Sequence, residues 1–127
     1  MIGLIEQTRI QARIALETLY EDRCTVIEVQ KVKDPITHIT SSQPVVLLED
    51  QPCKLSFSSV NSAGKKEGVA TVGQVVKLFI APEIIIKPGS KISVTHLGNV
   101  LEYKSSGQEA NYPTHKEIVL ELTKEYA

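Results

Sequence analysis

The sequence predicts a mainly β protein, a small antiparallel β-barrel or rolled sheet with one N-terminal α-helix and long loops. Two observations carry this prediction. From residue 23 to residue 122, short segments rich in β-branched residues alternate apolar and polar side chains, and turn-forming residues separate them. Helical periodicity occurs only at the N-terminus, so the strand–helix alternation of a parallel sheet is absent.

Length and composition indicate one domain over residues 1–127, with the helix over 1–20 and the barrel over 23–122. Hydrophobic residues make up 42% and charged residues 23%, which is typical of a globular protein. A net charge of -1 gives no overall attraction to nucleic acid or to an anionic membrane. Without a long apolar run or a secretion signal, we expect no membrane contact and a cytoplasm-like compartment.

Residues 1–20 have the spacing of an amphipathic helix. The polar stripe comprises Glu6, Arg9, Arg13 and Glu17, and the opposite apolar side comprises Ile5, Ala12, Leu16 and Leu19. Arg13 and Glu17 are spaced to form an ion pair. Four further apolar residues widen the arc beyond what one small sheet covers: Ile2, Leu4, Ile10 and Ile14. The arc is either a wide core-facing stripe or a contact with another subunit, and both interpretations stay open.

The first half of the predicted barrel is a series of short strands joined locally. In order, we expect a strand over 23–32, a long hairpin tip over 33–44, a return strand over 45–48, a turn over 49–52 and a strand over 53–57. Asp34-Pro35 breaks the first strand, since proline cannot donate to a β-ladder. The third strand alternates apolar Cys53, Leu55 and Phe57 with polar residues.

The second half contains the clearest strand pattern. We expect strands over 74–80, 84–86, 92–95, 100–103 and 117–122, with Ile118, Leu120 and Leu122 facing inward. Pro88 and Gly89 predict a type II turn, because proline presets φ and glycine supplies a positive φ. Gly98-Asn99 predicts a hairpin reversal. Two long loops, 58–73 and 104–115, interrupt the pattern, and loops of this length are usually functional or disordered.

The sequence contains no clear motif for catalysis, phosphate binding or metal binding. Cys24 and Cys53 have no metal-ligand spacing and are expected as two reduced, buried thiols. His38, His96 and His115 lie in separate turn or loop regions, and we expect surface histidines without partners. No phosphate-binding glycine loop and no GxSxG motif is present. We therefore predict no catalytic, cofactor or metal site and no enzyme activity.

One acidic residue and one alternative function also need to be considered from the sequence. Glu83 is the one acid in apolar surroundings of the kind that raises a pKa, and we expect it at a strand break facing solvent. A small β-barrel that binds single-stranded nucleic acid is the alternative function. Aromatic residues are only 5%, without tryptophan, and Lys65-Lys66 is an ordinary solvated pair, so this alternative lacks its usual stacking residues and basic cluster.

The layout resembles the small β-barrel proteins of bacteriophage necks, the head completion, stopper and head–tail joining proteins. The residues that carry the resemblance are Ile86, the "KPGSKI" step over 87–92, the "GNVLEY" hairpin over 98–103 and the last strand over 118–122. The resemblance implies a virion protein that assembles in the host cytoplasm. It implies a ring of six or twelve copies that joins the portal, or an adaptor, to the tail and closes the DNA channel between packaging and ejection.

This resemblance also assigns candidate residues. The loop over 58–73 becomes the candidate channel element, with Ser58, Asn61, Lys65, Lys66, Glu67 and Gly68. Its lysines either meet DNA phosphates or belong to a plain flexible loop. Candidate subunit contacts lie on the helix and the hairpin tip: Ile2, Leu4, Ile10, Ile14, Ile36 and Ile39. Stopper, adaptor and tail-terminator roles stay open.

Overall fold

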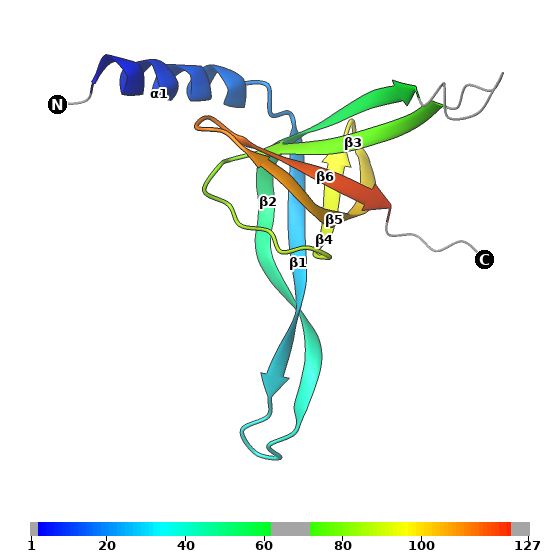
Figure 1. Ribbon diagram of the computed structural model, residues 1–127. Helices are drawn as coiled ribbons and strands as arrows, with labels where there is room; N and C mark the ends of the chain where they lie inside the picture. Colours follow the sequence, from blue (N-terminus) through cyan, green and yellow to red (C-terminus); the bar gives the residue numbers. More distant parts are fainter. Residues whose placement is uncertain (1–2, 62–71, 123–127) are drawn as a thin grey trace.

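A computed structural model describes residues 3–61 and 72–122 and shows a closed antiparallel β-barrel with one N-terminal helix (Figure 1). The elements are α1 (Leu4–Glu17), β1 (Asp22–Lys33), β2 (Thr40–Asn61), β3 (Val72–Ile80), β4 (Lys91–His96), β5 (Asn99–Asn111) and β6 (Lys116–Leu122). Around the barrel the strand order is β1-β2-β3-β6-β5-β4. The predicted fold class is confirmed.

The core lies inside the barrel and follows the predicted alternation. Its largest fully buried side chains are Leu78, Ile80, Ile92, Ile118, Val26, Val94, Cys24 and Cys53. Burying an aliphatic side chain of this size contributes about 1.5–3 kcal/mol. Leu122, which the sequence predicts to face inward, is instead 64% exposed, and Phe57 of the alternating third strand is 41% exposed. Leu122 is the last residue of β6, and its side chain is not part of the buried core cluster.

Strand β2 is one continuous element where the sequence predicts two strands and a turn. Asp50 has a positive φ of 55°, and the register with β1 shifts between Cys24 and Val26. A β-bulge therefore absorbs the turn-forming residues 49–52 and bends β2 without ending it. The predicted turn is wrong for this reason. Beyond the bulge, β2 pairs with β1 as far as Cys53 and with β3 from Lys54 to Asn61.

Both long loops are shorter than predicted. Ser58 pairs with Val75 and Asn61 with Val72, so the ends of the 58–73 segment belong to the β2–β3 ladder. Small polar side chains concealed this pairing, because the ladder is built from backbone groups. In the 104–115 segment, β5 continues to Asn111 through a register shift at Gly107, whose φ is 89°. Residues 112–115 alone connect β5 to β6.

The two turns predicted on either side of β4 are present, one of them shifted by one residue. Gly89 has a φ of 83°, and the Ser90 amide donates to the Lys87 carbonyl at 3.1 Å, which confirms the type II turn. The hairpin reversal lies at Leu97-Gly98, one residue earlier than predicted, because His96 and Asn99 form the last pair. Residues 84–86 are part of the 81–90 loop and not a strand.

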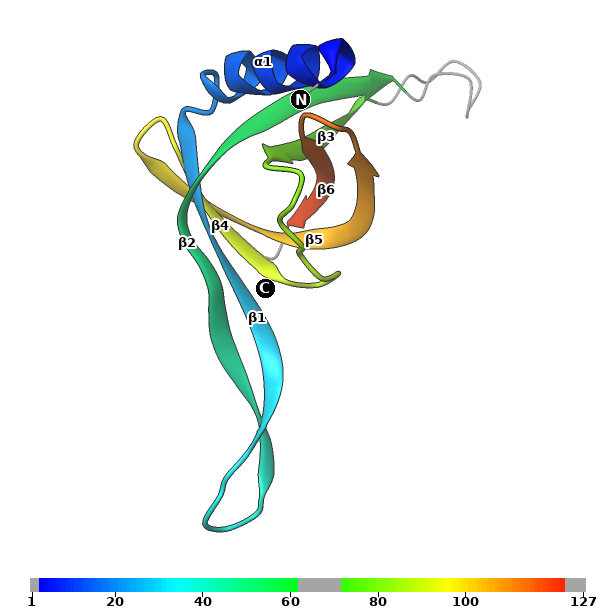
Figure 2. The ribbon, with the colours of Figure 1, turned by 90° about the vertical axis from the view of Figure 1, so that its left-hand side faces the viewer.

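Beyond the barrel, β1 and β2 form a two-stranded arm. Strand β1 pairs with β4 only over residues 23–27, whereas residues 28–33 pair only with residues 40–45 of β2. We call residues 28–47 the arm. Figures 1 and 2 show it projecting from the barrel, with its tip at the end of the molecule far from α1. Within the described chain, no helix is long and apolar enough to cross a bilayer.

Candidate subunit-contact surfaces

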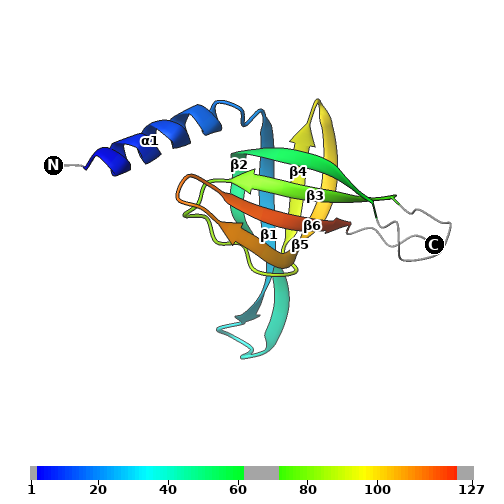
Figure 3. The ribbon, with the colours of Figure 1, turned by 45° about the horizontal axis from the view of Figure 1, so that its top comes forward.

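Helix α1 presents its apolar residues to solvent. None of its residues is buried, and Leu4, Ile10 and Ile14 are exposed by 78%, 44% and 60%. Figures 1 and 3 show the helix extending away from the barrel from its C-terminal end. Of the two interpretations of the apolar arc, the core-facing stripe is wrong. The helix also covers less than the predicted 1–20, since residues 18–21 connect it to β1.

The polar stripe of α1 makes the contact with the barrel. Arg13 donates from Nε to Glu17 at 2.8 Å, as predicted, and from Nη2 to Glu83 at 2.5 Å. The hydrogen bond to Arg13 lowers the pKa of Glu83, and the same pair raises the pKa of Arg13. Glu83 is solvent-facing, as predicted, but its partner lies 70 residues away. No local spacing in the sequence indicates this ion pair.

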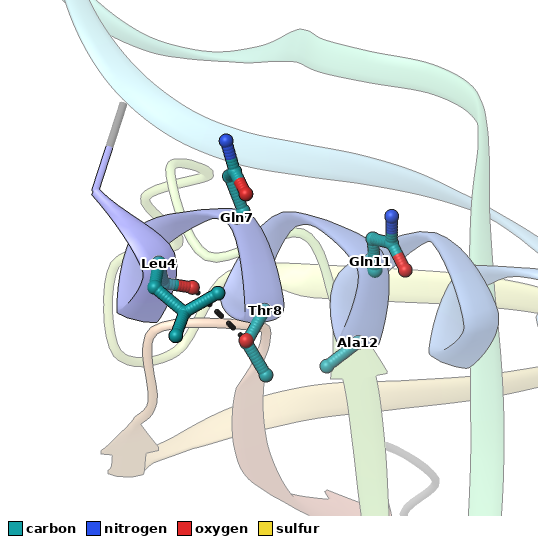
Figure 4. Close-up of a pocket in the computed structure, with 5 residues that line it drawn as sticks. All are labelled: Leu4, Gln7, Thr8, Gln11 and Ala12. Atoms are coloured by element: carbon teal, nitrogen blue, oxygen red, sulfur yellow. Dashed lines mark hydrogen bonds between the residues drawn. The ribbon is translucent and has the colours of Figure 1, made fainter. Parts of the chain in front are cut away.

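One side of α1 forms a shallow groove of about 440 Å³. Figure 4 shows its lining residues, Leu4, Gln7, Thr8, Gln11 and Ala12, with Leu4 and Thr8 on the same side of the helix. The Thr8 hydroxyl donates to the Leu4 carbonyl at 3.0 Å. This surface combines apolar and hydrogen-bonding groups, as protein–protein interfaces do.

The tip of the arm is a compact hydrogen-bonded loop, which we call the knob (residues 34–39). The Asp34 carboxylate accepts from the amides of Ile36 and Thr37 at 2.7 and 3.2 Å. The amide of Asp34 donates to the Ile39 carbonyl at 2.9 Å, closing the loop. Ile36 and Ile39 are 86% and 65% exposed. The predicted contact residues therefore sit on a loop whose backbone is already ordered.

A second concavity, which we call the hollow, lies where α1 meets the barrel. It measures about 350 Å³ and is lined by Arg13, Glu17, Tyr20, Gln51, Pro52, Ala81 and Glu83. Three separate segments build it: the end of α1, the β2 bulge and the start of the 81–90 loop. Burial raises the pKa of Tyr20 to about 12, so its hydroxyl stays protonated. The sequence gives no signal for the hollow, because its walls come together only in the fold.

Exposed charges differ between the two ends of the β1–β2 ribbon. Lys31 and Lys33 immediately precede the knob in the chain. Glu21 follows Tyr20, and Glu49 precedes Gln51 by two positions, and both Tyr20 and Gln51 line the hollow. All four side chains are exposed, and none forms an ion pair with another described residue. Glu28, at the base of the arm, is different because it is buried and pairs with Lys87 at 3.1 Å. The ribbon is basic toward the knob and acidic toward the hollow.

Two of the three histidines have partners, so the expectation of three partnerless surface histidines is wrong. His96 Nδ1 lies 2.8 Å from the buried Asp22 carboxylate, and His115 Nε2 lies 2.8 Å from Glu117. The first pair spans 74 positions and was invisible to a search for local spacing. His38 is exposed on the knob with a positive φ of 61°. In residues 3–61 and 72–122, no group of three or more His, Cys, Asp or Glu side chains is arranged to hold a metal ion.

The two cysteines behave as predicted. Cys24 and Cys53 are free thiols, 1% and 0% exposed. The hydrogen bond between the Cys53 and Cys24 thiols and burial in the core raise the pKa of Cys53. A thiol held protonated in this way is a poor nucleophile. The pair therefore belongs to the core.

The candidate channel residues are only partly described. Ser58 is exposed in the β2–β3 ladder, and Asn61 forms the last pair of that ladder. The remaining candidates, Lys65, Lys66, Glu67 and Gly68, lie outside the described residues. The ladder ends at the pair of Asn61 and Val72, the described residues on either side of this segment.

A short aromatic stack lies on the barrel near the β5–β6 connection. The ring of His115 stacks on Tyr112 and on Phe79, with centroid distances of 4.7 and 5.2 Å. The charges beside the stack belong to an ion pair, in which Lys77 Nζ lies 3.7 Å from the Glu117 carboxylate. A site that tracks a nucleic-acid strand needs a basic groove beside its stacking rings. This stack lacks one among the described residues.

Comparison with known proteins gives a fold likeness. No protein-family model and no curated protein matches the sequence. The structure is similar to that of protein xkdH of the phage-like element PBSX from Bacillus subtilis, with a TM-score of 0.50. The likeness covers 80% of this chain and 92% of that chain, at 13% sequence identity. At this identity the likeness concerns the fold.

Proposed function

We propose that this chain is a bacteriophage virion protein that forms a ring in the neck, joins the head to the tail and helps to close the DNA channel. The observation that carries the proposal is the fold likeness to a protein of a phage-like element, which extends over 80% of the chain. It agrees with the resemblance of the "KPGSKI" and "GNVLEY" segments to neck proteins, and the type II turn of the first segment is present.

The surface of the single chain supports a role in assembly. Leu4, Ile14 and Ile36 are more than half exposed on elements that project from the barrel. A two-stranded ribbon is at best marginally stable alone in water and gains from packing against a partner. A helix with exposed apolar residues gains in the same way. The ring offers neighbours to both elements.

We infer that the role is structural and not catalytic. Burial raises the pKa of Tyr20, an ion pair lowers the pKa of Glu83, and a hydrogen bond with Cys24 raises the pKa of Cys53 in the core. The hollow that Tyr20 and Glu83 line also contains the Glu17 carboxylate, and Arg13 forms an ion pair with both Glu17 and Glu83. Structural ion pairs perturb pKa values in the same manner.

Deletion of the gene from the phage or prophage that carries it tests the proposal. We expect heads that have no tails and do not retain packaged DNA, together with separate, complete tails, in electron micrographs of the lysate. Supplying the wild-type gene in trans is the control and should restore tailed particles. Normal tailed particles from the deletion strain, or a complete lack of heads, would contradict the neck role.

A further inference from the structure

We propose that the knob of one copy inserts into the hollow of a second copy, with Lys31 and Lys33 of the first facing Glu21 and Glu49 of the second. This contact deepens the ring role and rests on it, because a ring needs two different complementary surfaces on each subunit. The structure supplies both surfaces on one chain.

The positions of the two surfaces exclude a contact within one chain. The knob and the hollow lie at opposite ends of the β1–β2 ribbon, as Figures 1 and 2 show for the arm tip and α1. A copy therefore cannot fill its own hollow. A contact from the knob of one copy to the hollow of the next repeats head to tail, and it closes into a ring when the rotation between copies permits.

The shapes fit this pairing. The hollow measures about 350 Å³, which exceeds the volume of an isoleucine side chain, and Tyr20, Pro52 and Ala81 give it apolar wall. Ile36 is 86% exposed at the extremity of the arm. Asp34 already fixes the loop through two amide hydrogen bonds, so little backbone entropy is lost on insertion.

The distribution of charge indicates which molecule occupies the hollow, a second copy of this chain or another partner. The knob side of the ribbon carries Lys31 and Lys33 and remains basic when Asp34 of the knob is counted, and the hollow side carries Glu21 and Glu49. Arg23 lies near the acidic side but leaves the acids in excess, since Asp50 is exposed there as well. Complementary charges at the two ends of one chain favour head-to-tail association of identical copies.

A charge-swap experiment tests the contact in solution. Wild-type protein should associate at low ionic strength in sedimentation velocity, and added salt should weaken the association. Lys31→Glu with Lys33→Glu makes both ends acidic, and Glu21→Lys with Glu49→Lys makes both ends basic. Each double variant alone should associate at least tenfold more weakly than wild type. An equimolar mixture of the two should recover association, because acidic knobs then meet basic hollows and basic knobs meet acidic hollows.

A second pair of variants tests the apolar part. Ile36→Asp should weaken association at least tenfold, because the carboxylate would be buried in the hollow. Leu122→Asp is the matched control, since Leu122 is 64% exposed at the far end of β6, and it should associate as wild type does. Circular dichroism should show the same fold in every variant, because all substituted side chains are exposed.

The result that overturns the contact is equally clear. A wild type that stays monomeric at every salt and protein concentration, double variants that associate normally, or a mixture that recovers nothing would each exclude it. These outcomes leave the neck role untouched, because that role is judged by the gene deletion in particles. Tailed particles without the gene would remove the neck role even if the purified chain associates through this contact.

Discussion

At the scale of single residues, the Asp22 carboxylate connects three neighbouring strands. It sits in β1, accepts from the Leu55 amide of β2 at 2.8 Å and lies 2.8 Å from His96 of β4. The Asp22 side chain is 5% exposed. A buried carboxylate that loses a hydrogen-bond partner keeps its desolvation cost, so each partner matters.

Replacing His96 therefore should destabilise the barrel. We expect His96→Ala to lower the free energy of unfolding by about 1–3 kcal/mol, as measured by urea denaturation. His38→Asn is the matched control, because His38 is exposed and asparagine tolerates its positive φ. The control should change stability by less than about 0.5 kcal/mol. Equal effects of the two substitutions would refute the role assigned to the Asp22–His96 pair.

At the scale of elements, the β5 bulge is fixed by the 81–90 loop. Gly107 has a φ of 89°, and a Cβ there would meet Pro88 side-chain atoms at 3.1 and 3.2 Å. Gly98 has a similar φ of 81° but open space around it. A substitution at Gly98 therefore reports the cost of backbone strain alone, whereas one at Gly107 adds the cost of the steric contact.

This difference gives a comparison of two substitutions. Gly98→Ala should cost about 1–2 kcal/mol from its backbone conformation alone. Gly107→Ala should cost about 1 kcal/mol more, because the new methyl group presses on Pro88. Thermal unfolding of both variants measures the difference, and Pro88→Ala in the Gly107→Ala background should recover part of it. Equal losses for the two glycine variants would show that Pro88 is not a rigid contact.

The Arg13–Glu83 ion pair orients α1 on the barrel. Glu83 is exposed by 62%, so the pair adds at most about 1 kcal/mol to global stability. Glu83→Gln should leave the urea midpoint nearly unchanged but speed hydrogen exchange of the α1 amides. Glu102→Gln is the matched control, because its pair with Lys91 is also exposed and lies between β4 and β5. Unchanged exchange in α1 of Glu83→Gln would mean that other contacts hold the helix.

The same pair predicts a pH dependence. The pKa of Glu83 is lower in the folded chain than in the unfolded chain, where the pKa of glutamate is about 4.3. The stabilisation is therefore complete above that value and is lost as the pH falls through the lowered pKa. Hydrogen exchange of α1 in the wild type should approach that of Glu83→Gln below about pH 4. The two should differ most at neutral pH.

The sequence predicted the strands better than their ends. Alternation in β1, β3 and β6 reports side chains that face a core, and those strands lie where expected. The bulges at Asp50 and Gly107 escaped detection, because turn-forming residues mark both bulges and strand ends. The surplus of apolar residues on α1 indicated an exposed surface only as one of two interpretations. The Arg13–Glu83 pair and the hollow were not predictable, because their parts are far apart in the chain.

At the scale of the whole molecule, two changes to the segment between β2 and β3 distinguish the residues needed for folding from those needed for channel closure. Replacing residues 63–70 by a two-residue Asn-Gly turn keeps the ladder from Ser58 to Asn61. The melting temperature should then change little, because the cost of closing a loop grows slowly with its length. Removing residues 58–73 instead deletes that part of the ladder and should destabilise the barrel. In the proposed role, particles with the short turn should join heads to tails but lose packaged DNA.

Two results would change this interpretation. Unfolding of the short-turn variant would show that residues 62–71 contribute to the core. Particles that fold, assemble and retain DNA as wild type does would remove this segment from channel closure, while the joining role would stand. Quantifying DNA per particle by nuclease protection measures the second outcome.

Electron cryo-microscopy of intact particles tests the central claim most directly. A reconstruction of the neck should contain this barrel in a ring between portal and tail, with α1 and the arm packed against neighbouring subunits. The chain is recognised there by its closed barrel in the order β1-β2-β3-β6-β5-β4 and by its projecting β1–β2 arm. A neck without this barrel, or particles that contain the chain only in the head shell or the tail tip, would contradict the account.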